Sequence, residues 1–340
     1  MTTLLRILVV AMIAGVVPVS AEAQQKVKLG TLAPKDSSFH RILTDMGAQW
    51  RAQGVELKIY AGGARGGESE MVSHMRNGAL DAGLLTVVGL SDIDHSVEAL
   101  QSIPMIFRSL AEVDYVGDRL RPRLEKRLRE KGFVVLFWAD AGWVRFFSRK
   151  PIVHPDDLRK AKLFTWAGDV PSVNLYRVSG FQPVPLETSD ILPALSTGMI
   201  DAVPLPPYIA LTTQVFVHAP YMLQLDWAPL VGALVVTEKR WNTLSPDVQR
   251  ELARAAGEAG RQMKERNRLE SDDAVVKMQT RGLHVTAVPP GVESEWRNIV
   301  EERYPQLRGA RVPADLFDEV VRLLGEYRRA NGQSAAGARR

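Results

Sequence analysis

The sequence predicts an α/β fold of two similar lobes spanned by one long helix. After the N-terminal segment, strand and helix patterns alternate as β-α-β-α-β within about 60 residues, which favours a mostly parallel sheet. The unit Gly78-Ala79-Leu80-Asp81-Ala82 recurs as Gly198-Met199-Ile200-Asp201-Ala202, so one helix-to-strand junction occurs twice. A helical pattern of roughly 35 residues begins near Ser245 and exceeds the size of one ordinary lobe.

The first residues predict a secretory signal peptide (1–23) rather than a part of the fold. Met1–Arg6 carries one positive charge, Ile7–Val17 is apolar, and Ser20–Ala23 offers an A-x-A cleavage site. The apolar run is too short and wrongly flanked for a transmembrane helix, and no other stretch approaches about 18 uninterrupted apolar residues. We expect cleavage after Ala23 and an exported protein that is not embedded in the membrane.

Composition excludes several classes of protein. The 340 residues include no cysteine, which excludes disulfides, thiolate chemistry and a lipid anchor on cysteine. The net charge of +4 is small, and the richest basic stretch, Arg119–Lys131, contains Glu125 and Glu130 and is typical of a solvated helix face. We therefore expect no nucleic-acid partner. Residues 331–340 are expected to form a disordered tail.

The first lobe is predicted from five consecutive elements. They are a strand at 26–32, a helix from Ser37 or Ser38 to about Gln53, a strand at 55–60, a helix at Ser69–Asn77 and a strand at Asp81–Val87. Gly78 stands where a glycine ends a helix. Helix follows at Leu110–Lys131, and Pro122 should end or kink it. A buried strand at 133–140 continues through Arg145–Ser148.

The second lobe repeats this pattern. Its predicted elements are strand 162–166, helix Ser172–Ser179, strand 182–186, helix Ser189–Thr197, strand 200–205, helix Pro207–Phe216 and strand Gly232–Thr237. A strand near 282–288 and helices at Val292–Arg303 and Ala314–Arg329 complete the chain. We assign 24–142 with about 230–265 to lobe I, and 143–229 with about 266–330 to lobe II.

The long helix has a strong start signal. Ser245 suits the N-cap, Pro246 suits the first helical position, and Asp247 favours the positive end of the helix dipole. The pattern can run to Gly282, which gives a helix of about 50 Å. Such a helix is long enough to bridge both lobes.

The motifs of common enzymes do not occur. We find no G-x-S-x-G, H-E-x-x-H or P-loop motif, and the six histidines lack the spacing of metal ligands. No metal, cofactor or catalytic residue is therefore expected. The stretch Gly62–Gly67 precedes a helix, where it forms either a flexible turn or an anion site. The Asp156-Asp157 pair is better explained as a helix start. Two facing α/β lobes instead predict a ligand site in the crevice between the carboxyl ends of their strands.

The chain resembles the solute-binding proteins of TRAP (tripartite ATP-independent periplasmic) transporters, of the DctP type. The resemblance rests on Lys26–His40, Ile59–Gly83, Ser102–Phe107, Gly142–Leu163, Ala194–Pro207 and the long late helix. It implies a two-lobe periplasmic solute-binding protein fold with a long helix spanning both lobes. It also implies a periplasmic protein that is not an enzyme. Such a protein would capture a small organic acid between two closing lobes and deliver it to a TRAP-type membrane permease for uptake.

The resemblance also implies where the ligand lies. The family arginine that pairs with a ligand carboxylate falls at Phe164, which can make no charged contact. An upstream family arginine matches Arg145, and a polar family position before a proline is Leu205. We therefore expect a more hydrophobic pocket for an acid with an apolar or aromatic part. Its residues would be Phe164, Trp166, Trp143 and Leu205, with Arg145 as the charge anchor and Glu68 and Tyr208 at the mouth.

The sequence also allows other roles for these residues and other functions for the protein. Phe164 and Trp166 would instead alternate between core and surface, and Arg145 would form a salt bridge between the lobes. The same fold also suits a sensory protein that presents its ligand to a membrane receptor. An exported enzyme on this scaffold would need a nucleophile or an acid–base pair in the crevice, and the sequence offers no convincing one.

Overall fold

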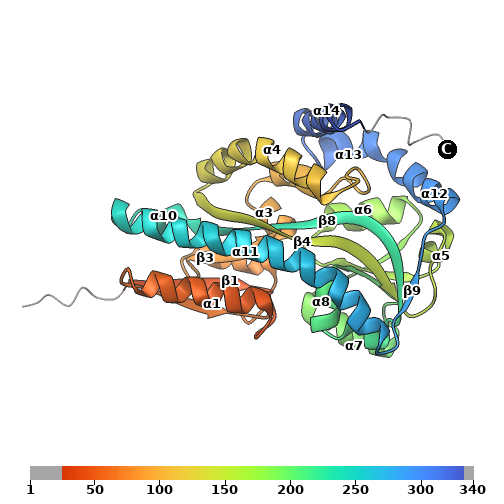
Figure 1. Ribbon diagram of the computed structural model, residues 1–340, viewed down its shortest axis with the longest axis horizontal. Helices are drawn as coiled ribbons and strands as arrows, with labels where there is room; N and C mark the ends of the chain where they lie inside the picture. Colours follow the sequence, from red (N-terminus) through yellow and green to blue (C-terminus); the bar gives the residue numbers. More distant parts are fainter. Residues whose placement is uncertain (1–24, 333–340) are drawn as a thin grey trace, which may run out of the picture.

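The computed structural model describes residues 25–332, so the predicted signal peptide and residues 333–340 of the predicted tail lie outside the described residues. A single nine-stranded sheet has the order β2-β1-β3-β8-β4-β7-β5-β6, with β9 paired to β8. Helices pack around this sheet, and α11 crosses the long strands β4 and β8 (Figure 1). Within residues 25–332, no helix is long and apolar enough to cross a membrane.

Lobe I is built on three parallel strands, as the sequence predicts. Its elements are β1 (Gln25–Thr31), α1 (Ser38–Arg51), β2 (Val55–Tyr60), α2 (Glu68–Arg76), β3 (Ala82–Thr86), α3 (Val87–Ser91), the 3₁₀ helix η1 (His95–Leu100) and α4 (Leu110–Glu130). Strand β3 pairs antiparallel with Gly232–Val236 of β8.

Lobe II repeats the arrangement. Its elements are α5 (Pro155–Arg159), β5 (Lys162–Trp166), α6 (Val170–Val178), β6 (Gln182–Leu186), η2 (Thr188–Asp190), α7 (Ile191–Thr197), β7 (Ala202–Leu205), α8 (Pro207–Thr212) and α9 (Val215–His218). Strand β5 runs parallel to β6 and β7, and β7 pairs antiparallel with Arg145–Ser148 of β4. The strand orders β2-β1-β3-β8 and β6-β5-β7-β4 therefore correspond.

The two repeated Gly-x-x-Asp-Ala units have matching contacts. Asp81 exchanges hydrogen bonds with the backbone of Lys28, at 2.9 and 2.8 Å. Asp201 does the same with Lys162, at 2.7 and 3.1 Å. In both units the lysine ammonium donates to the carbonyl of the helix-ending glycine, which has a positive φ. Each aspartate thus fixes where a helix ends and a parallel strand begins.

Three elements run through both lobes. They are β4 (Phe133–Ser148), β8 (Tyr221–Thr237) and α11 (Pro246–Gln279). The pairing of β4 with β8 shifts register between Asp140 and Trp143, where Gly142 has φ +77°. Helix α11 contacts α1 in lobe I and α8 in lobe II (Figure 1), so the predicted helix spanning both lobes is confirmed.

The C-terminal part packs on the long strands β4 and β8, on α4 and on a lobe II core cluster. It comprises α10 (Glu238–Trp241), β9 (His284–Thr286), α12 (Pro290–Glu301), α13 (Tyr304–Ala310) and α14 (Ala314–Ala330). Helix α14 packs on α4 with the lobe I core, whereas α12 packs into a lobe II cluster through Trp296. The predicted assignment of 266–330 to lobe II therefore does not describe the packing of α14.

Pro122 does not end its helix. Helix α4 continues from Leu110 to Glu130 with Pro122 inside, so of the two predicted outcomes, an end or a kink, the end is wrong. Leu120, Leu124 and Leu128 are fully buried on both sides of the proline. Burial of each such side chain is worth about 1.5–3 kcal/mol, which together exceeds the roughly 3 kcal/mol cost of an internal proline.

Candidate functional site

The two lobes meet at a crevice into which the carboxyl ends of their parallel strands point. A cavity of about 150 Å³ lies there. Lobe I lines it with the ends of β1 and β3, and lobe II lines it with Trp166 at the end of β5 and Leu205 at the end of β7. The middles of β4 and β8, at 139–141 and 230–232, form its floor. This is the position at which open α/β sheets bind ligands.

Trp166 also lines two smaller cavities. One, of about 110 Å³, shares Trp166 and Leu230 with the 150 Å³ cavity. The other, of about 50 Å³, lies beside Glu68 and Thr188. The half-buried Trp166 ring therefore divides the crevice into three compartments. Its edge-to-face contact with the buried Phe164, at 5.0 Å between ring centroids, fixes it in place.

Glu68 is a buried carboxylate in the crevice wall at the first position of α2. It accepts hydrogen bonds from the Thr86 N–H at 2.8 Å, the Thr86 hydroxyl at 2.6 Å and the Gly89 N–H at 2.9 Å. Burial raises the pKa of Glu68, and these hydrogen bonds oppose that rise. The side chain thus ties α2 to the junction of β3 and α3 beside the cavity.

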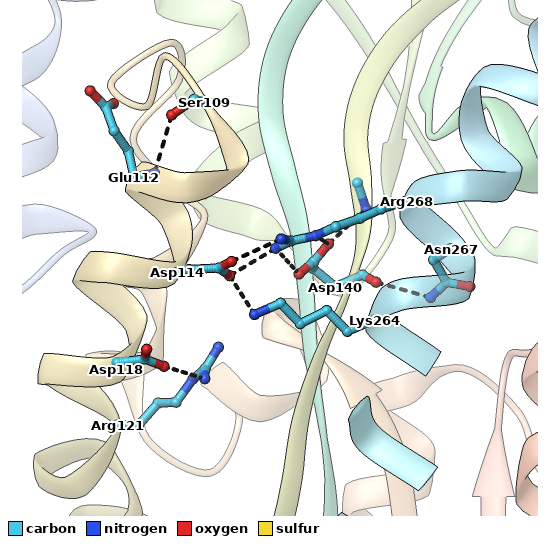
Figure 2. A network of polar contacts seen from close by, with 10 residues as sticks. Ser109, Glu112, Asp114, Asp118, Arg121, Asp140, Lys264, Asn267 and Arg268 are labelled. Atoms are coloured by element: carbon cyan, nitrogen blue, oxygen red, sulfur yellow. Dashed lines mark hydrogen bonds and ion pairs between the residues drawn. The ribbon is translucent and has the colours of Figure 1, made fainter. Parts of the chain in front are cut away.

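A network of charges lies where β4 changes register (Figure 2). Arg268 of α11 donates to Asp140 at 2.7 and 3.2 Å and makes two 2.8 Å hydrogen bonds to Asp114 of α4. Lys264 also pairs with Asp114, and the Asn267 amide donates to the Asp140 carbonyl. Burial disfavours the charge of Arg268, but the two aspartates outweigh it and raise the pKa of Arg268.

A second buried group of charges borders the 110 Å³ cavity. Arg311 contacts Asp169 at 2.7 and 3.1 Å and Glu98 at 2.8 Å. It thereby joins the start of α6 in lobe II to η1 in lobe I. Burial raises the pKa of Glu98, whereas for Asp169 the attraction of Arg311 outweighs burial and lowers the pKa. The N–H groups of Arg311 are therefore paired with carboxylates on two sides.

Four of the residues predicted for the site line the crevice. Trp166, Leu205 and Glu68 line the 150 Å³ cavity, and Phe164 and Trp166 line the 110 Å³ cavity. Phe164 is fully buried and belongs to a lobe II core cluster. Trp166 and Leu205 end their strands and Glu68 begins α2, whereas Phe164 lies in the middle of β5.

The other three predicted residues line none of the described cavities. Arg145 of β4 donates from Nε to Asp226 of β8 at 3.1 Å. The Tyr208 hydroxyl accepts hydrogen bonds from the backbone N–H and the hydroxyl of Ser38. Trp143 packs half-buried against the lobe I core. Ligand contact by these three residues stays a prediction.

Several residues that line the crevice were not predicted from the sequence. Asp140, Thr165, Arg303 and Arg311 line it, and no motif marks them. Asp140 and Thr165 fall inside predicted strands, and a strand pattern does not show that these two side chains line the crevice. Arg303 and Arg311 approach from the C-terminal helices, and the sequence holds no sign of that contact.

The fold and the crevice define a class of two-lobe binding proteins, and comparison with known proteins agrees. Residues 29–309 match the family described as bacterial extracellular solute-binding protein, family 7. The chain belongs to this family. The family captures solutes outside the cytoplasm and delivers them to a membrane permease without catalysing a reaction. The predicted family, the two-lobe α/β fold and the prediction of a binding protein rather than an enzyme are confirmed.

Individual relatives have known ligands. The chain is 27% identical over 254 residues to the 2,3-diketo-L-gulonate-binding periplasmic protein YiaO of Escherichia coli (strain K12), covering 71% of this chain and 74% of that protein. A TRAP periplasmic solute-binding protein from Sulfitobacter sp. NAS-14.1 with bound β-D-galacturonate superposes with a TM-score of 0.79 at 19% identity, covering 90% of this chain and 100% of that chain. One from Sulfurospirillum deleyianum DSM 6946 with bound succinate gives 0.81 at 19% identity, covering 88% and 99%.

Proposed function

We propose that the chain is a periplasmic solute-binding protein that captures a small organic acid with an apolar or aromatic part and delivers it to a TRAP-type permease. The acid is inferred from the relatives, among them those that carry galacturonate and succinate. The apolar part is inferred from the crevice. The single observation that carries the proposal is the 150 Å³ cavity between the carboxyl ends of the strands of both lobes.

The lining of this cavity supports an apolar ligand body. Of the described residues that line it, only Glu68 and Asp140 carry ionisable side chains. Both carboxylates are already satisfied, Glu68 by the hydrogen bonds of Thr86 and Gly89 and Asp140 by Arg268. Trp166 and Leu205 present apolar surface beside them. Burial of an apolar ligand against this surface favours binding by about 25 cal/mol for each Å² of apolar surface removed from water.

We propose that the ligand is captured when the two lobes close around it by a hinge motion. The flexible point is the irregular pairing of β4 with β8 between Asp140 and Trp143. The proposed division assigns 24–142 with about 230–265 to lobe I and 143–229 with about 266–330 to lobe II, and α14 packs across it. Closure would remove the ligand from water and strengthen its polar contacts.

Export is proposed to remove the first 23 residues. The family acts outside the cytoplasm, and the N-terminal sequence has the charge, apolar run and small residues of a signal peptide. Mass spectrometry of the protein from the periplasm is expected to find an N-terminus at Gln24. A mature protein that retains Met1 would contradict this part of the proposal.

A thermal-unfolding screen tests the proposed function. Benzoate, phenylacetate, cyclohexanecarboxylate and succinate are added to the purified mature protein, with benzamide as a neutral control. A ligand at 100 times its dissociation constant stabilises the native state by about 2.7 kcal/mol. At least one acid is expected to raise the midpoint while benzamide does not, and mass spectrometry of the purified protein identifies any retained solute. No shift with any acid would contradict the proposed ligand class.

A further inference from the structure

The 110 Å³ compartment of the crevice differs in chemistry from its neighbour. Its walls come from both lobes and from the end of α12. Aromatic rings of Trp166, Phe181 and Trp227 form its apolar surface, and Thr165, Arg303 and Arg311 are among its polar side chains. No lysine or arginine of the described residues lines the other two crevice compartments. An anion that enters the crevice therefore meets a cation only here.

Of the two arginines that line this compartment, Arg303 leaves most of its hydrogen-bonding capacity unused. Its Nε is buried and has no partner, and it forms no ion pair with a carboxylate of residues 25–332. Its hydrogen bond within the described chain runs from Nη1 to the exposed Gln306 side chain at 3.5 Å, the outer limit for such a bond. Arg311, in contrast, is held by Asp169 and Glu98. A buried guanidinium nitrogen without an acceptor is costly, and a bound carboxylate would satisfy it.

Thr165 supplies a second unused group in the same compartment. Its side chain is 2% exposed, and its hydroxyl has no hydrogen-bond partner in the described chain. It lies in β5 between the buried Phe164 and the dividing Trp166. A hydroxyl donor and a guanidinium beside one cavity match the two oxygens of a carboxylate. Without a ligand or water, both groups pay a desolvation cost.

We propose, resting on the proposed function, that Arg303 and Thr165 bind the carboxylate of the acid, and that Arg145 does not. The ligand is then a small monocarboxylate with a ring or a branched chain. A cavity of about 150 Å³ can hold a benzene ring, and the neighbouring compartment has this volume and shares Trp166 and Leu230 with the 110 Å³ compartment, so the ring would lie there while the carboxylate enters the 110 Å³ compartment. A second carboxylate would lie against aromatic walls or near Asp169, so dicarboxylates bind poorly.

Calorimetric titration of three variants tests the inference against the wild type. Arg303→Gln removes the charge, Thr165→Val removes the hydroxyl at nearly constant shape, and Arg281→Gln removes an exposed charge outside the cavities. Titrants are benzoate, cyclohexanecarboxylate and succinate. Arg303→Gln is expected to weaken monocarboxylate binding about tenfold to hundredfold, and Thr165→Val about threefold to tenfold. Arg281→Gln is expected to change it less than about twofold.

Thr165→Val also separates a ligand contact from a structural role. Because its hydroxyl has no partner in the protein, the variant should unfold at the same or a higher temperature than the wild type while it binds the acid more weakly. If Arg303→Gln and Thr165→Val both bind the acid as tightly as the wild type, this inference is overturned and the proposed function is left intact. A wild-type protein that binds none of the acids overturns both. Tighter binding of succinate than of benzoate overturns the proposed ligand class.

Discussion

At the residue scale, Arg145 shows how a charged side chain in a binding protein can be occupied by its own fold. Its side chain is 13% exposed and pairs with the half-exposed Asp226. Burial raises the pKa of Asp226, and the attraction of Arg145 opposes that rise. An arginine engaged in this way has fewer donors left for a ligand, and it lines none of the described cavities.

Arg145→Gln is therefore expected to change stability more than binding. The lost contact with a half-exposed aspartate should lower the free energy of unfolding by about 1 kcal/mol or less, as for other solvent-accessible ion pairs. Acid affinity should stay within about twofold of the wild type. Urea unfolding and calorimetry measure the two quantities. If affinity instead falls tenfold or more at unchanged stability, Arg145 is the charge anchor that the sequence predicts.

Side-chain partners were the least predictable part of the site. Phe164 and Leu205 were found because they match ligand-binding positions of the family that the sequence resembles, and Trp166 lies two residues from Phe164 on the same predicted strand. The Arg145–Asp226 pair joins positions 81 residues apart, and nothing in either local segment reveals it. Arg303 reaches the crevice only because α12 and α13 pack beside it, which depends on the tertiary fold.

At the element scale, α11 is fixed to the sheet by a close approach of its backbone. A Cβ at Gly260 would lie 2.6 Å from Cβ and 2.7 Å from Cγ of Phe137 in β4. Such contacts are far inside van der Waals distance, so only glycine fits there without a shift of the helix. Gly257, one turn earlier, has open space, since the nearest atom is 3.9 Å away at the end of the Arg261 side chain.

These two glycines form a matched pair for mutation. Gly257→Ala is expected to stabilise the protein by about 0.5–1 kcal/mol, because alanine favours the helix and nothing obstructs it. Gly260→Ala gains the same helix propensity, but its methyl group must displace Phe137. The free energy of unfolding is therefore expected to fall by about 1–3 kcal/mol. Chemical denaturation of both variants gives the comparison. Equal stabilisation by the two substitutions would mean that α11 does not pack this closely on β4.

The elements themselves were largely predictable. The strand at 162–166 matches β5, and the helix expected from Ser245 to Gly282 is α11, Pro246–Gln279. The first half of β8, Tyr221–Leu230, was not predicted, because it contains Pro229 and follows Pro220, and proline argues against a central strand. Here Pro229 lies beside the β4 irregularity, where the ladder is already interrupted.

At the scale of the whole molecule, the network around Arg268 joins three elements at the point where the lobes meet. Arg268→Met leaves the buried Asp140 carboxylate without its ionic partner, although Lys264 remains for Asp114. Loss of one member of a buried ion pair costs about 3–5 kcal/mol. Ligand affinity should fall as well, because Asp140 lies in the floor of the crevice.

Arg266→Met is the control on the same helix. Arg266 is 57% exposed and pairs with Glu270 one turn away, an arrangement worth only about 0.3–0.5 kcal/mol. Equilibrium unfolding of both variants tests the difference. Equal losses would show that the Arg268 network does not support the junction of the lobes.

The link between the lobes through Arg311 and Asp169 should respond to acid. Because the pKa of Asp169 is lowered in the folded protein, its contribution is fully present above the unfolded pKa of about 3.9 and is lost as pH falls through the folded value. Glu98, with its raised pKa, acts in the opposite direction. Asp169→Asn should therefore destabilise the protein at pH 6 and less so at pH 3, as measured by urea unfolding. A difference that does not depend on pH would exclude a lowered pKa at Asp169.

The pairing of β3 with β8 has a consequence for the order in which the chain can fold. Ala82 pairs with Val236, so the sheet of lobe I lacks a strand until most of the chain has been synthesised. Until then β3 offers an open edge, and the contact that closes it spans a long separation in sequence, which slows folding. The connection that makes the lobes one sheet thus also delays completion of the lobe I sheet until β8 has been synthesised.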